Sequence, residues 1–149
     1  MTVVVRPRKV RVIAGIVAVL LLAAFTVAGL FMLRTHTGAY FTLSDQLAMI
    51  GIGMFLAAGA LWFTRPRVRA DAEGVEVRNL LGARHFPWTE VHQVSFPDGS
   101  PWARLELPHD EYVPVIAIQA IDGERAVTAM RELRRVRREA AAQDSVRGA

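Results

Sequence analysis

The sequence contains no cysteine. This absence excludes disulfide bonds, thiol nucleophiles and zinc sites built on cysteine ligands. The sequence also lacks a P-loop, a glycine-rich dinucleotide turn, an HExxH motif and a GxSxG motif. We therefore expect a protein that is not an enzyme, with no catalytic residues, no cofactor and no metal.

Lysine is almost absent, and the net charge of +4 is unevenly distributed. From Arg65 to the C-terminus, 13 arginines face 13 acidic residues, so this part is neutral. The excess sits at Arg6, Arg8, Lys9 and Arg11, directly before the first apolar run. Basic residues in that position orient a membrane helix and contact anionic headgroups. We therefore predict a membrane partner and no nucleic acid.

Two long apolar runs dominate the first half of the chain. Residues 12–33 form a run of 22 without a charge, and a helix of that length rises about 33 Å, enough for a hydrocarbon core of about 30 Å. Residues 47–63 form a shorter run, which the residues from 43 onward extend into the interface. The sequence predicts a transmembrane hairpin over 12–63, with helices at 12–33 and 43–63.

The flanking charges predict the orientation of this hairpin. Residues 1–11 form a basic N-terminus, and Arg65, Arg67 and Arg69 follow the second run, whereas the link holds only Arg34. Basic residues concentrate on the cytoplasmic side of membrane helices. We expect a two-span protein of the plasma (inner) membrane, with its N-terminus and its C-terminal domain in the cytoplasm.

A cleaved signal peptide is the competing interpretation of the first run. The start is basic, and Thr26, Val27 and Ala28 resemble a cleavage site. The apolar stretch continues past any such cut. It is also longer than the hydrophobic region of a typical signal peptide, which has about 7–15 residues. Neither run contains an ionisable residue, which argues against a transporter. Small residues recur four apart, a pattern that we attribute to chance, at Ala14/Ala18, Ala24/Ala28 and Gly53/Ala57.

Short alternating segments begin at Arg67 and are separated by turn residues, as in antiparallel strands. Asp122, which we predict to be an N-cap, then precedes a helical pattern with apolar residues at 127, 130, 133 and 136. The sequence predicts an α+β membrane protein: the two-helix hairpin, then a β-sandwich or split barrel at 65–142 capped by a C-terminal helix. We expect residues 143–149 to form a flexible tail.

A family resemblance lies in the middle of this domain. Residues 79–82 end a strand pair, and Phe86, Pro87, Trp88 and Val91 follow in a Pro-Trp-x-x-Val step. This resembles the bacterial pleckstrin-homology-like (PH-like) membrane proteins, closest to the actinobacterial group named after low molecular weight protein antigen 6. The resemblance implies a barrel-like fold with a capping helix and a binding or assembly module. The aromatic residues themselves favour core packing.

Candidate binding residues are one tryptophan and two groups of arginines. Trp102 falls on the opposite parity from Leu105 and Leu107, so it either contacts a partner or packs at an edge. The arginines either meet anionic headgroups or an acidic partner, or are solvated, and they are Arg65, Arg67, Arg69, Arg134, Arg135 and Arg138. The run His109-Asp110-Glu111 is assigned to a solvated loop, because no metal-ligand spacing is present. His92 and Ser95 are assigned structural roles, because no third group is visible that would orient them as base and nucleophile.

These observations leave two functional hypotheses. The first is a non-catalytic module, anchored in the lipid bilayer, that recruits or scaffolds an unknown membrane protein, for example by strand addition at a sheet edge. The alternative is a domain that responds to anionic lipid headgroups through its arginines.

Overall fold

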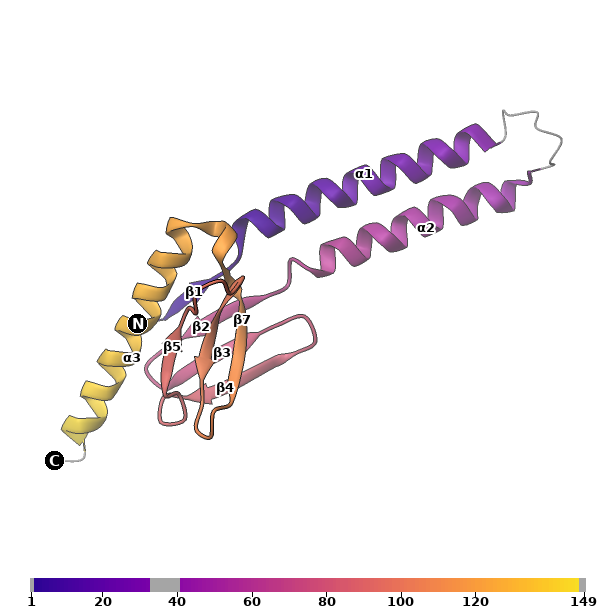
Figure 1. Cartoon of the computed structure of the whole chain (residues 1–149). Coiled ribbons are helices and arrows are strands. Elements are labelled where there is room, and N and C mark those ends of the chain that lie inside the picture. Colours follow the sequence, from indigo (N-terminus) through magenta and orange to yellow (C-terminus); the bar gives the residue numbers. More distant parts are fainter. Residues whose placement is uncertain (1, 33–40, 148–149) are drawn as a thin grey trace. The chain divides into compact units, whose positions relative to one another are not determined.

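The computed structural model describes residues 2–32 and 41–147. Arg34, the single basic residue of the link, lies outside these residues. The chain divides into two compact units (Figure 1). One contains residues 10–64, and the other joins the segment through Lys9 to everything from Arg65 onward. In chain order the elements are β1 (Val3–Val5), α1 (Arg8–Met32), α2 (Leu43–Trp62), β2 (Arg67–Ala70), β3 (Gly74–Arg78), β4 (Ala83–Pro87), β5 (Gln93–Ser95), β6 (Trp102–Glu106), β7 (Tyr112–Gln119), the 3₁₀ helix η1 (Ala120–Asp122) and α3 (Glu124–Arg147).

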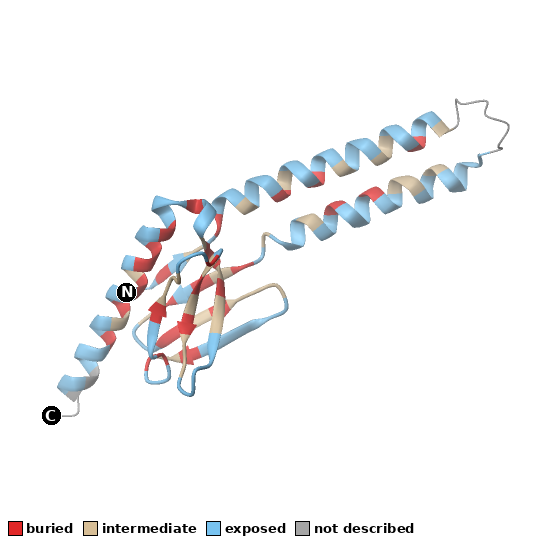
Figure 2. Ribbon diagram, viewed as in Figure 1, coloured by how far each residue is buried: buried red, intermediate tan, exposed pale blue. Residues whose placement is uncertain are grey.

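The first unit consists of the helices α1 and α2, which occupy the two predicted apolar runs. Both are long and apolar enough to cross a membrane. Their side chains are mostly exposed, as the pale blue ribbon of both helices shows (Figure 2). Thr42 and Asp45 form a capping box that defines the start of α2.

Small residues occupy the buried positions of this helical unit. The buried residues are Ala14, Ala18 and Gly29 on α1, and Gly53 and Ala57 on α2. A Cβ built on Gly53 would lie 2.5 Å from the Cβ of a phenylalanine on α1, so only glycine allows the helices to approach here. Two of the three small-residue pairs are therefore packed, whereas the third, at positions 24 and 28, is exposed.

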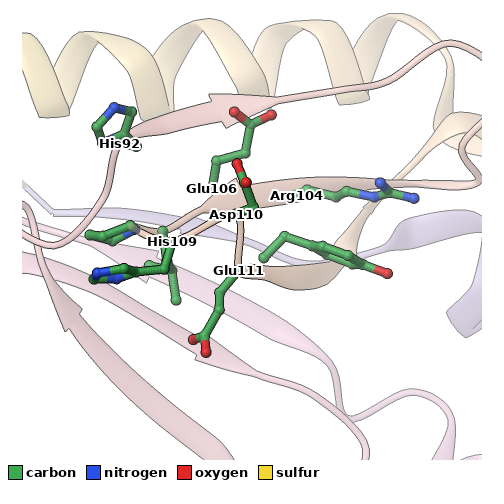
Figure 3. A pocket seen from close by; sticks show the side chains of 9 residues that line it. His92, Arg104, Glu106, His109, Asp110 and Glu111 are labelled. Carbon is green, nitrogen blue, oxygen red and sulfur yellow. The ribbon is translucent and has the colours of Figure 1, made fainter.

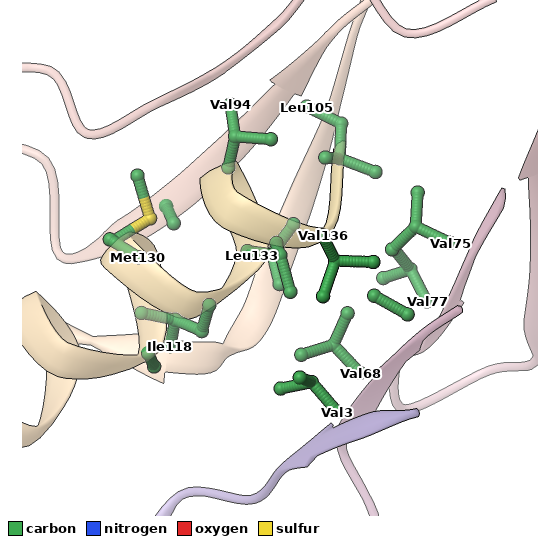
Figure 4. Packing of buried hydrophobic residues seen from close by; sticks show 14 of the residues in the cluster. Val3, Val68, Val75, Val77, Val94, Leu105, Ile118, Met130, Leu133 and Val136 are labelled. Carbon is green, nitrogen blue, oxygen red and sulfur yellow. The ribbon is translucent and has the colours of Figure 1, made fainter. Parts of the chain in front are cut away.

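The second unit is an α+β domain with two antiparallel sheets. One sheet has the order β1-β2-β3-β4 and the other β5-β6-β7. Alternate residues of the strands face inward, so that Val68, Val75 and Leu105 are fully buried. α3 lies against these residues and contributes Leu133 and Val136 to the same core (Figure 4). These features confirm the prediction of two sheets of antiparallel strands with a C-terminal helix packed on their core.

Strand β1 comes from the N-terminal segment, which the sequence did not assign to the domain. Val3 pairs with Ala70 and Val5 with Val68 in the register of β1 and β2. Val3 is buried and joins the hydrophobic core. The segment before the first long helix therefore forms the outer strand of the four-stranded sheet.

Asp122 has a different role from the predicted one, which was to cap the C-terminal helix. Its carboxylate accepts a hydrogen bond from the backbone N–H of Lys9, at 3.0 Å, in the first turn of α1. That turn contains no acidic residue of its own and carries cations, an arrangement that the helix dipole disfavours. Gly123, with a φ of 58°, then separates Asp122 from α3. The prediction failed because the partner lies 113 residues away in the sequence.

The chain crosses between the two sheets at Trp88–Glu90, which form a turn. Val91 and His92 lie between this turn and β5, so the alternation of apolar and polar residues breaks there. The register of β6 and β7 is irregular between Trp102 and Ala103, at the start of β6.

α3 continues to Arg147, so residues 143–147, which the sequence suggested as a flexible tail, are helical. The extension follows a run of alanines at 140–142, which are the residues with the highest helix propensity.

Candidate binding surfaces

α3 lies beside β5, the outer strand of the three-stranded sheet, and two of its arginines bind the backbone there. Arg134 donates to the carbonyl oxygen of Val94 from Nε and Nη2, at 3.1 and 3.0 Å. Arg137 donates to the carbonyl oxygen of His92. An unpaired strand edge invites pairing with another chain. These two guanidinium groups bind the carbonyl of Val94 in β5 and that of His92 directly before it, and so they compete with such pairing.

Two adjoining hollows lie along the same helix and strand, and together we call them the α3–β5 groove. The apolar hollow, of about 410 Å³, is lined by Phe96, Ala120, Gly123, Ala126, Val127, Met130, Arg131 and Arg134. The basic hollow, of about 650 Å³, is lined by Gln93, Val94, Arg131, Arg134, Arg137, Arg138 and Ala141. The hollows share Arg131 and Arg134, so an apolar surface passes directly into a basic one.

The structure places only part of the predicted arginine group in this groove. Arg134 and Arg138 line it, whereas Arg135 points elsewhere and pairs with Glu139 at 3.6 Å. Arg131 and Arg137 line the groove but were not among the predicted binding residues. The signal was available, since residues three, four and seven apart share one helix face.

The arginines at the start of the domain do not belong to the groove. Arg67 lies 3.6 Å from Glu76, and Arg69 is opposite Glu76 in the register of β2 and β3. Arg69, within β2, and Arg65, two residues before β2, are both exposed. The predicted arginines therefore occupy two separate parts of the domain.

Trp102 is half-buried on β6, on the face opposite to the buried Ala103 and Leu105. Its carbonyl oxygen accepts a hydrogen bond from the hydroxyl of Ser100 at 2.8 Å, and Gln119 lies opposite it in the sheet. Trp102 is thus placed at a sheet surface, and it is not among the residues that line the groove.

The residues that carried the family resemblance lie in and beside the core. Phe86, Trp88 and Val91 are buried, and Pro87 ends the outer strand β4, where its missing N–H interrupts no ladder. The indole nitrogen of Trp88 donates to the carbonyl of Asp71 at 2.7 Å. This bond holds the turn between β2 and β3 against the crossing between the sheets.

A third, polar hollow of about 300 Å³ surrounds the hairpin between β6 and β7 (Figure 3). His92, His109 and Asp110 line it together with Glu106 and Glu111. The carboxylates of Glu106 and Glu111 point away from each other (Figure 3). In the described part of the chain, no three such side chains gather closely enough to hold a metal ion.

The electrostatics of this hollow centre on Glu106. The nearby Ser95 hydroxyl, followed by the Gln93 amide and the charge of His92, lowers the pKa of Glu106. The side-chain amide of Gln93 donates a hydrogen bond to this carboxylate. The Ser95 hydroxyl lies near it but makes no hydrogen bond with any described residue. A carboxylate stabilised in its charged form is a weaker general base than a carboxylate of ordinary pKa.

Comparison with known proteins places the chain among relatives. A family model described as "Bacterial PH domain" matches residues 65–136. Two uncharacterized mycobacterial proteins are each 47% identical to this chain over 132 residues, which cover 89% of this chain and 86% of the relative. They are Rv1417 of Mycobacterium tuberculosis (strain ATCC 25618 / H37Rv) and Mb1452 of Mycobacterium bovis (strain ATCC BAA-935 / AF2122/97). No solved structure matches the chain. These matches show that residues 65–136 form a bacterial PH domain and that the chain belongs to one family with these mycobacterial proteins.

Proposed function

We propose that this protein is a membrane-anchored, non-catalytic PH-like binding module that recruits or scaffolds a membrane protein at the cytoplasmic face of the plasma membrane. One observation carries the anchoring: large apolar side chains are exposed on both α1 and α2, among them Val19, Leu20, Met54 and Phe55. Water would make that exposure unfavourable, at roughly 25 cal/mol for each Å² of apolar surface. A bilayer removes the cost.

The distribution of charge supports the cytoplasmic placement of the domain. The basic residues at the start of α1 and after α2 lie at the same end of the helical hairpin, because Gly29 near the end of α1 packs beside Gln46 near the start of α2. Basic residues at one end of a hairpin favour the cytoplasmic side for that end. The PH-like domain would then stand beside the membrane, at high effective concentration for its neighbours.

Two of the strand edges are already occupied by side chains. The β5 carbonyls bind arginines, and Asn79 bonds the edge of β7, donating to the Pro114 carbonyl at 2.9 Å and accepting from the Ile116 N–H at 3.4 Å. Strand addition by a partner therefore requires another edge, such as β4, whose residues 83–85 are exposed.

Anionic lipid headgroups are the second candidate ligand, favoured by the arginines of the α3–β5 groove and by Arg65 and Arg69. Salt separates the two candidates. Binding to headgroups through exposed arginines should fall steeply as ionic strength rises, whereas an apolar protein contact should persist.

The absence of cysteine allows a direct test of the anchoring. Two single-cysteine variants, Thr37→Cys between the two helices and Asp98→Cys in the domain, are treated in intact cells with a membrane-impermeant maleimide. We expect labelling of Thr37→Cys only. Labelling of Asp98→Cys from outside, or recovery of the full chain in the soluble fraction without detergent, would contradict the proposal.

Recruitment is tested by cross-linking in native membranes, followed by identification of the attached proteins. Trp102→Ala provides the comparison, because the side chain is half-buried at a surface and lies outside the core cluster. Loss of a co-purified protein with unchanged lipid binding would support a protein partner at this surface. Retention of every partner would remove Trp102 from the binding surface.

A further inference from the structure

We infer that the α3–β5 groove binds an extended, acidic segment of a partner protein that carries an apolar residue next to its acidic side chains. This inference rests on the proposed function as a binding module and names the site and the chemistry of the partner. It starts from the four arginines that line the basic hollow, Arg131, Arg134, Arg137 and Arg138.

These arginines divide into two pairs. Arg134 and Arg137 are held by the backbone of β5, as described above. Arg131 and Arg138 are exposed, and within the described residues they have neither a hydrogen bond nor an ion pair. No acidic residue lines either hollow. The positive charge of the groove is therefore not balanced by acidic residues that line it. A negatively charged ligand would balance this charge.

The spacing of the available pair favours an extended chain. Arg131 and Arg138 are seven residues apart on α3, which corresponds to about 10.5 Å along the helix axis. An extended chain covers that length in about three residues. A single phosphate requires donors that converge on one point, whereas two carboxylates along a strand-like segment meet two separate guanidinium groups. The geometry therefore favours an acidic peptide over a lone headgroup.

The apolar hollow adds the second requirement. Phe96 and Met130 contribute to its floor, and the side chain of Val127 is 50% exposed at its rim. An apolar side chain of the partner placed here would bury surface that water otherwise covers. Because the two hollows adjoin, one short segment would fill both. The partner segment is thus amphipathic along its length, apolar at one end and acidic at the other.

The test uses the full-length protein in neutral detergent and a fluorescein-labelled synthetic peptide, Phe-Val-Glu-Val-Asp-Glu, with blocked ends. Fluorescence anisotropy measures its affinity for the wild type, for Arg131→Gln/Arg138→Gln and for the control Arg135→Gln. The control removes a charge from the same helix outside the groove. We expect the double variant to weaken binding at least tenfold, since two charge-assisted contacts are lost, and Arg135→Gln to change it less than about threefold.

Several results would overturn the inference. They are an affinity of the wild type weaker than about 1 mM, an equal loss in Arg135→Gln, or no loss in the double variant. A peptide with serine in place of phenylalanine must also bind less tightly, or the apolar hollow has no part in it. Displacement of the peptide by phosphatidylglycerol added as mixed micelles with the same detergent, and not by phosphatidylcholine added in the same way, would assign the groove to lipid. Because the cysteine-labelling experiment does not involve the groove, its outcome separates a failure of anchoring from a failure of this site.

Discussion

Replacement of Asp122 tests whether a distant carboxylate stabilises the start of α1. The variants Asp122→Asn and Asp122→Ala differ in what they remove: asparagine retains an acceptor for the Lys9 N–H, and alanine removes it. Loss of a capping side chain costs about 0.5–2 kcal/mol, and loss of negative charge at a helix N-terminus about 0.3–1 kcal/mol. Asp122 is buried, so solvent replaces its hydrogen bond poorly. We therefore expect a loss of about 1–2 kcal/mol for alanine and less than about 1 kcal/mol for asparagine.

Hydrogen–deuterium exchange of the peptide that contains Lys9 measures this effect locally, in the full-length protein in detergent. A loss of about 1.4 kcal/mol should accelerate exchange of the Lys9 amide about tenfold, with a smaller acceleration in the asparagine variant. Asp98→Ala serves as the control, because that side chain is exposed in a loop. Unchanged exchange in Asp122→Ala would refute the capping role, and equal effects of both variants would show that charge, and not the hydrogen bond, is responsible.

Three further changes test local packing by thermal unfolding of the full-length protein. Gly74→Ala places a Cβ 2.4 Å from a backbone carbonyl oxygen of β4, so we expect a loss of about 1–3 kcal/mol, against little change in Gly82→Ala, which has open space. Gly53→Ala should weaken the pairing of α1 and α2 by a similar amount, while Gly59→Ala, also in open space, should be neutral or slightly stabilising; equal melting temperatures would contradict the proposed contact. His109→Gly relieves a left-handed backbone with a φ of 64°, so it should stabilise the hairpin by about 0.5–1 kcal/mol, and a destabilised variant would indicate contacts of the imidazole that outweigh this strain.

The elements that the sequence predicted well are those with strong local patterns. The uncharged run at 12–33 and the alternation of Val75 and Val77 determine the type of each element without reference to the rest of the chain. The Pro87-Trp88 step added the family, because it marks a crossing between sheets that local propensity does not describe. Fold class and family were therefore accessible from the sequence.

Long-range partners were not accessible in the same way. β1 contains three residues, too few for a pattern, and its partner β2 begins after both long helices. The bond between Asp122 and Lys9 likewise joins residues with no shared local signal. Periodicity constrains which face of an element is apolar, but tertiary packing decides what that face meets. For this reason the N-terminal segment was predicted only as a basic flank.

The arginines of α3 show why charge alone could not define a binding site. By composition, the run at 134–138 is one basic patch at the end of a helix. The helical period of 3.6 residues separates its members onto different faces. Arg135 meets Glu139 within its own helix, Arg134 and Arg137 close the edge of β5, and Arg138 joins Arg131 in the groove. Because two of these arginines bind the backbone at the edge of β5, the proposed site relies on the other two as donors for a ligand.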